Sequence, residues 1–219
     1  GYTYNYNSAG GTLVNNTITS NSYSIRAGFE SAGNILYGVS KMINMRKNKD
    51  GEYAILGIPY AQYLKGDFDF AKNIIIDHRN SLAFHAGIGV AVPYGNAKVV
   101  PFEKRYFSGG ANSVRGWSVR NLGPGSFAGD GNFMNQSGDI KLDASIEYRT
   151  RLFWKFRGAA FIDAGIIWTI REYENQPGGA FEFDKFYKQI AVAYGLGLRL
   201  DLDFFVLRFD GGMKAVNPK

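Results

Sequence analysis

The chain of 219 residues is 45% hydrophobic, 16% aromatic and 20% charged, without cysteine, which excludes a disordered chain, a disulfide scaffold and thiolate metal sites. The mean hydropathy is −0.20, and no apolar run approaches the length of about 18 residues that a membrane-spanning helix needs. The net charge is +6, but the basic residues are scattered, so the sequence does not indicate a nucleic-acid partner.

Apolar residues alternate with small or polar ones along most of the sequence, which is the pattern of β-strands, and no convincing helical stripe is found. We therefore expect an all-β fold. The alternation predicts nine strands, over Tyr2–Asn7, Ser22–Ala32, Asn34–Ile43, Pro59–Ala71, Ser81–Val92, Gly138–Leu152, Phe156–Trp168, Ile190–Leu200 and Phe204–Lys214.

Several of these strands are long for a soluble sheet. Ser81–Val92 and Gly138–Leu152 span 12 and 15 residues, whereas strands of soluble proteins average about 5–6 residues and a membrane-spanning strand needs about 9–11. Each long strand has one apolar face and one small or charged face. In a soluble sandwich the apolar faces would form a core, and in a membrane barrel they would face lipid while the polar faces line the lumen.

The connections between the predicted strands alternate in length. Long loops over 8–21, 44–58, 94–137 and 169–188 alternate with tighter turns near 33, 77–80, 153–155 and 201–203. This alternation is typical of an antiparallel transmembrane β-barrel of the Gram-negative outer membrane, with short periplasmic turns and long external loops. Because bacterial barrels have an even number of strands, nine strands predict that residues 1–219 form part of a larger barrel.

The loop over 94–137 exceeds the roughly 12–15 residues of a passive connection, which predicts a functional role. It contains Val114-Arg115-Gly116-Trp117 after Gly109-Gly110, and the second strand after it contains Phe161-Ile162-Asp163-Ala164-Gly165. These two motifs, two strands apart, resemble those of the bacterial surface antigen family, the BamA/TamA-like outer-membrane assembly proteins. The run Arg120–Gly125 is similar to TamA-like members from Bacteroidetes. The resemblance covers most of the chain.

The resemblance implies that the nine strands are strands seven to fifteen of a sixteen-stranded barrel, with the loop over 94–137 inserted into the lumen. It implies a component that assembles or inserts outer-membrane proteins, or that translocates proteins across the membrane. The implied partners are outer-membrane lipid and unfolded β-barrel precursors or secreted proteins. Accessory lipoproteins or an inner-membrane partner are further candidates.

A loop inserted in the lumen would bury the guanidinium of Arg115, which then needs a carboxylate partner. By alternation, Asp163 faces the lumen from one strand and Glu147 from the adjacent strand. We expect Arg115 to pair with Asp163, with Glu147 as the second candidate, and the family resemblance likewise implies the contact with Asp163. Gly116 and Gly165 would allow close approach of the loop, while Trp117 would pack against the wall.

Two other functions stay open. A two-partner secretion transporter would share both motifs and export one dedicated substrate, whereas a passive channel or surface receptor would need no pinned loop. No catalytic constellation, cofactor site or metal site is predicted, because His78 and His85 have no partner at metal-ligand spacing. Gly87-Ile88-Gly89 lies inside a strand with no following helix and is therefore not a nucleotide-binding loop.

Overall fold

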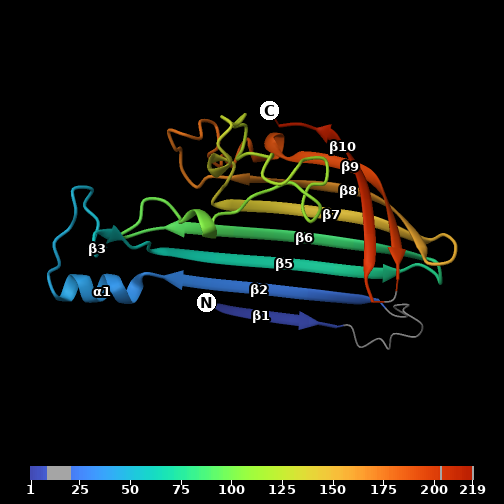
Figure 1. The fold of residues 1–219 in the computed structure, drawn as a ribbon, viewed down its shortest axis with the longest axis horizontal. Coiled ribbons are helices and arrows are strands. Elements are labelled where there is room, and N and C mark those ends of the chain that lie inside the picture. Colours follow the sequence, from blue (N-terminus) through green and yellow to red (C-terminus); the bar gives the residue numbers. More distant parts are fainter. Residues whose placement is uncertain (9–20, 203, 219) are drawn as a thin grey trace.

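The computed structural model describes residues 1–8, 21–202 and 204–218. Within them, one antiparallel sheet of eight strands has the order β1-β2-β5-β6-β7-β8-β9-β10 (Figure 1). Its strands are β1 (Tyr2–Asn7), β2 (Ser22–Ala32), β5 (Tyr63–Ile75), β6 (Asn80–Pro93), β7 (Ile140–Arg151), β8 (Phe156–Trp168), β9 (Ala191–Asp201) and β10 (Val206–Val216). The other elements are the helix α1 (Asn34–Met42), a small hairpin of β3 (Ala54–Ile55) and β4 (Ile58–Pro59), and the 3-10 turns η1 (Phe102–Lys104), η2 (Phe133–Asn135) and η3 (Phe186–Gln189).

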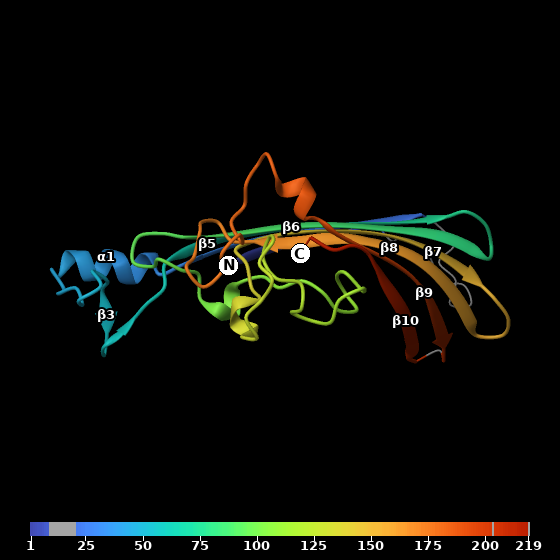
Figure 2. The same cartoon turned by 90° about the horizontal axis from the view of Figure 1, so that it is seen from above.

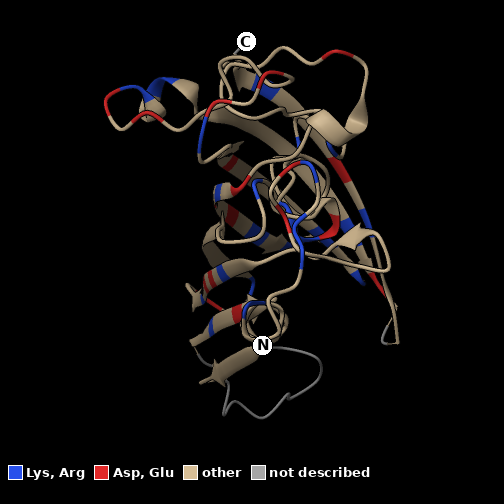
Figure 3. Ribbon diagram, turned by 90° about the vertical axis from the view of Figure 1, so that its left-hand side faces the viewer, with Lys and Arg blue, Asp and Glu red and all other residues tan. Residues whose placement is uncertain are grey.

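The sheet is curved, and the connection between β6 and β7, here called loop 94–139, lies on its concave side (Figure 2). Charged residues are interspersed along the strands (Figure 3). Glu147 of β7 turns toward the loop and is buried, whereas the neighbouring Ile146 and, on β8, Ile162 are 48% and 56% exposed. Polar residues facing inward and apolar residues facing outward are the arrangement of a transmembrane barrel wall.

The predicted strand over Asn34–Ile43 is wrong. Residues Asn34–Met42 form α1, and β2 pairs with β5 instead. The described sheet therefore has eight strands rather than nine. The strand predicted over Pro59–Ala71 begins at Tyr63, because Pro59 belongs to the small hairpin. No helix among the described residues is long and apolar enough to cross a membrane.

The chain leaves the sheet at Gly33, which has a φ of 79°. An added Cβ at this position would lie 2.3 Å from the carbonyl oxygen of Ala61, so the turn requires glycine. After the turn, Ile35, Val39 and Met42 follow the i, i+4, i+7 spacing of a helix. The error in the sequence prediction was therefore one of period, since a short apolar run is compatible with both a strand and a helix.

The connections lie at two different ends of the sheet (Figure 1). Residues 33–62, 94–139 and 169–190 connect strands at what we call the long-loop end. Residues 76–79, 152–155, 202 and 204–205 lie at the opposite end, which we call the short-turn end. In the turn 76–79, the Asp77 side chain accepts hydrogen bonds from the backbone N–H groups of Arg79 and Asn80, at 2.7 and 2.9 Å. The tight turn predicted near 33 is wrong, because Gly33 begins the long connection 33–62 that contains α1. From β2 onward long and short connections alternate, whereas most of the loop predicted over 8–21 lies outside the described residues.

Replacing Ile162 with arginine should destabilise the intact protein in a phospholipid bilayer by about 2–4 kcal/mol, because it places a charge on the lipid-facing side of a central strand. Urea unfolding in vesicles measures this loss. The matched control is Ile35→Arg, at an 84% exposed position of α1 beyond the strand ends, which should have little effect. Equal losses in the two variants would contradict the assignment of the convex face to lipid.

Candidate functional site

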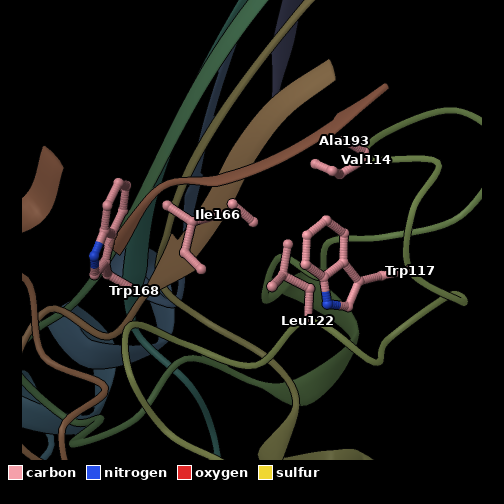
Figure 4. Close-up of a cluster of buried hydrophobic side chains, with 7 residues drawn as sticks. Val114, Trp117, Leu122, Ile166, Trp168 and Ala193 are labelled. Carbon is pink, nitrogen blue, oxygen red and sulfur yellow. The ribbon is translucent and has the colours of Figure 1, made fainter. Parts of the chain in front are cut away.

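A hydrophobic cluster joins loop 94–139 to β8 and β9 (Figure 4). Val114 and Trp117 of the loop motif are 0% and 4% exposed, and Figure 4 shows Val114 beside Ala193 and Trp117 beside Leu122. The cluster also contains Ile166, Trp168 and Ala191. Because burial of these side chains removes apolar area from water, the cluster stabilises the loop against the wall.

Arg115 extends from this cluster to a pair of carboxylates on β7 and β8. Its Nε and Nη2 each donate a hydrogen bond of 2.7 Å to the two carboxylate oxygens of Asp163, and its backbone N–H donates to Oδ2 at 3.1 Å. Its Nη1 donates to Glu147 Oε2 at 2.6 Å. The side chains of Arg115 and Asp163 are only 7% and 1% exposed. The structure thus brings Arg115 against both predicted partners, with the bidentate geometry that lysine could not provide.

A third carboxylate, Asp210 of β10, lies 3.3 Å from Arg115 Nη1 and was not predicted. Its signal in the sequence is weak, because the flanking glycines interrupt the alternation of β10. The guanidinium also stacks 3.4 Å above the ring centre of Phe161. Loop 94–139 is therefore tied to three strands, β7, β8 and β10, through one side chain.

The three buried carboxylates form a charge network with Arg115 and the nearby arginines, here called the Arg115 anchor. Glu147 Oε1 accepts hydrogen bonds from Arg149 Nε at 2.6 Å and forms an ion pair with Arg199 at 2.7 Å, while Arg208 Nε donates to Asp210 Oδ2 at 2.7 Å. Burial acts to lower the pKa of Arg115, but its hydrogen bonds to the carboxylates outweigh burial and hold that pKa above its ordinary value. Arg115 is therefore permanently charged.

Two of the predicted glycines lie where the loop touches the wall. A Cβ added at Gly116 would lie 2.8 Å from Ala193 Cβ, and one added at Gly165 would lie 3.0 Å from Val114 Cγ2. A side chain at either position would push the loop away from β8 and β9. The close approach that brings Arg115 within reach of Asp163 thus depends on small residues on both surfaces.

A second buried ion pair, missed by the sequence analysis, joins the start of loop 94–139 to its end and is hydrogen-bonded to the connection 169–190. Arg105 Nε donates to Asp139 Oδ1 at 3.1 Å, and Arg105 Nη2 donates to Gln176 Oε1 at 3.0 Å. Asp139 Oδ2 accepts from Ile170 N–H and from the Tyr173 hydroxyl, both at 3.1 Å. Burial, together with the charge of Asp139, raises the pKa of Tyr173 to about 12, so this phenol remains a donor at neutral pH.

Tyr106 of the same loop occupies the space above Gly89 of β6. Its hydroxyl donates to Asp67 Oδ1 at 2.7 Å, and a Cβ at Gly89 would lie 2.5 Å from the ring. His85 lies between Asp69 and Asp143, with nitrogen to oxygen distances of 3.5 and 3.3 Å. Residues 1–8, 21–202 and 204–218 contain no group of three His, Cys, Asp or Glu side chains that could hold a metal ion.

Replacing Arg115 with alanine should destabilise the intact protein by about 3–5 kcal/mol, because it leaves Asp163 and Glu147 buried without their partner. Arg115→Lys keeps the charge but loses the bidentate geometry, so it should give a smaller loss. Urea unfolding in vesicles measures both effects, and trypsin cleavage within loop 94–139 reports release of the loop. Lys98→Ala, at an exposed position of the same loop, is the control. An alanine variant as stable as this control would refute the role of the Arg115 anchor.

Comparison with known proteins gives a family model, a related sequence and a similar fold. A model of the Omp85 superfamily domain matches residues 45–219. The outer membrane protein assembly factor BamA of Neisseria meningitidis serogroup B (strain ATCC BAA-335 / MC58) is 30% identical over 102 residues, which are 42% of this chain and 12% of that protein. The crystal structure of BamA from Haemophilus ducreyi lacking POTRA domains 1-3 matches with a TM-score of 0.57 and 18% identity, over 90% of this chain and 48% of that one.

The chain therefore spans about half the length of this solved relative and about an eighth of the curated one. The matches confirm the predicted family, the β-barrel fold class and an outer-membrane location. They do not address the TamA-like subtype or the Bacteroidetes origin, which stay predictions. Because the domain model covers most of its length, the chain belongs to the Omp85 superfamily.

Proposed function

We propose that this chain forms part of an outer-membrane barrel that assembles or inserts other outer-membrane proteins, or translocates proteins across the membrane. The observation that carries the proposal is the Arg115 anchor, which ties loop 94–139 to three strands from inside the curved sheet. The neisserial relative, an outer membrane protein assembly factor, supports the same assignment. The sheet would be part of a larger barrel, with its convex face in lipid.

The anchor's proposed work is mechanical. Arg115 sets the distances between β7, β8 and β10, because one rigid guanidinium contacts a carboxylate on each. The loop then keeps the wall curved while the rest of the barrel opens or deforms for a client. No catalytic residue, cofactor or energy source is part of this proposal. The clients would be unfolded β-barrel precursors or secreted proteins, with accessory lipoproteins or an inner-membrane protein as assisting partners.

Two-partner secretion is the second candidate, because a transporter for one dedicated substrate would use the same loop motif and the same anchor. A passive channel or receptor fits less well. The ion pair of Arg115 holds loop 94–139 against the wall, and the Arg105–Asp139 pair joins the start of the loop to its end. A loop fixed in this way on the concave side obstructs a lumen. The two candidates that remain differ in how many client proteins depend on the barrel.

Depletion of the intact protein, followed by quantitative proteomics of the outer membrane, tests the proposal. General assembly predicts a fall in many β-barrel proteins, since each would depend on the same insertion step. The secreted proteins are quantified in the same cultures, and loss of a single one with an unchanged outer membrane would support dedicated secretion. An unchanged outer membrane together with unchanged secreted proteins would refute both.

Complementation with variants ties this result to the anchor. Lys98→Ala should restore the outer-membrane proteome, whereas Arg115→Ala should not, even where the variant is present in the membrane at the same level. Full restoration by Arg115→Ala would show that the anchor is dispensable for function.

A further inference from the structure

The short-turn end of the concave face holds a cavity of about 280 Å³, here called the mouth cavity. Among the described residues that line it, six are arginines and two are aspartates, Asp77 and Asp201. The arginines are Arg79, Arg149, Arg151, Arg157, Arg199 and Arg208. The cavity is thus strongly basic, in contrast to the three carboxylates of the neighbouring Arg115 anchor.

Four of these arginines form a row across four adjacent strands. Arg151 of β7 lies directly opposite Arg157 of β8 in the register. Arg157 in turn lies opposite Arg199 of β9, and Arg199 lies opposite Arg208 of β10. Like charges directly opposite one another destabilise a sheet. The register therefore places like charges opposite one another three times in succession. A further anion at the row would reduce the repulsion that their own carboxylate partners leave.

Two of the carboxylates that pair with this arginine row also pair with Arg115. Asp201 pairs with Arg157 at 2.7 Å. The partners of Arg199 and Arg208 are Glu147 and Asp210, which also serve Arg115.

One donor of the row has no acceptor. Arg199 is only 11% exposed, and its Nη1 is buried without a hydrogen-bond partner among the described residues. A buried donor without an acceptor is costly, so the cavity lacks at least one acceptor oxygen.

We propose that the mouth cavity binds the carboxylates of an acidic, extended polypeptide segment that enters the lumen from the short-turn end. Arginine presents a planar fork that matches a carboxylate with two parallel hydrogen bonds. The arginine row lies on the inner face of the sheet, because Arg208 and Arg199 contact the carboxylates of the Arg115 anchor. The neighbouring Leu198 and Phe209 are exposed on the opposite, lipid-facing side. This position favours a polypeptide in the lumen over a lipid headgroup.

A second cavity, of about 510 Å³, extends the site toward the centre of the sheet. It is lined by Arg115, Glu147 and Asp163 and shares Arg149 and Arg208 with the mouth cavity. An extended segment could thus follow the wall from the short turns to the Arg115 anchor. That the bound segment belongs to a client protein rests on the proposed function. The basic site itself is inferred from the strand register and from the residues that line the cavity.

Fluorescence anisotropy of a labelled peptide of alternating Asp and Ser, titrated with the intact protein in detergent, tests the site directly. We expect binding that weakens with salt and no binding of the matched Asn/Ser peptide. Arg151→Gln combined with Arg157→Gln should weaken binding about tenfold or more. Asp201→Asn should strengthen it several-fold, because it removes a competing carboxylate, and a gain in affinity cannot come from misfolding. The charge-matched control, Arg46→Gln with Arg171→Gln, alters two exposed residues at the long-loop end and should leave binding unchanged.

Absence of binding by the unmodified protein, or equal losses in the glutamine pair and the control pair, would overturn the proposal. A competition experiment with phosphatidylglycerol nanodiscs could also overturn the proposal. If the lipid abolished peptide binding by the unmodified protein but left the residual binding of the Arg151→Gln, Arg157→Gln variant unchanged, the cavity would bind lipid phosphate instead. Peptide binding is measured without any assembly reaction. Its failure therefore leaves the depletion experiment intact, and a failed depletion experiment would not remove the acidic-peptide site.

Discussion

The position of loop 94–139 depends on one buried cation. Arg115 is almost fully removed from water, and a guanidinium in that position is tolerated only when carboxylates surround it. Three strands supply them, and the guanidinium also stacks on Phe161. The hydrophobic cluster around Trp117 and the clearance at Gly116 and Gly165 serve the same contact, since each brings the loop close enough to the wall for the ion pairs to form.

The two buried ion pairs of the loop have different consequences. Buried pairs contribute little net stability compared with apolar packing, but breaking one is costly, so they select one arrangement rather than strengthen it. Arg115 selects the position of the loop against β7, β8 and β10. Arg105 and Asp139 instead join the start and the end of loop 94–139 at the long-loop end, and Gln176 and Tyr173 of the connection 169–190 form hydrogen bonds with this pair. The position of the loop is thus fixed at two places, at Arg115 in its middle and at Arg105 near its start.

The sequence predicted those features that a regular pattern of residues along a strand, or a motif, indicates. Alternation over many residues defined most barrel strands, and the two motifs brought Arg115 to Asp163 and Glu147 because strand register fixes which residues face each other. The helix α1 was missed since its apolar run is short and compatible with two periods. Asp210 was missed because the glycines that follow it interrupt the alternation of β10. The Arg105–Asp139 pair was missed because both residues lie outside the regular strands, where alternation does not indicate the direction of a side chain.

The anchor and the arginine row share Glu147 and Asp210, and this sharing couples the two ends of the site. Glu147 is bonded to Arg115 through one oxygen and to Arg199 through the other, and Asp210 links Arg115 with Arg208. An anion that draws Arg199 or Arg208 away from these carboxylates therefore changes the strength of their electrostatic attraction to Arg115. Such coupling is reciprocal, so the strength with which the loop is held also changes the affinity of the mouth cavity. Glu147 and Asp210 thus couple binding of a segment in the mouth cavity to the position of loop 94–139 against the wall.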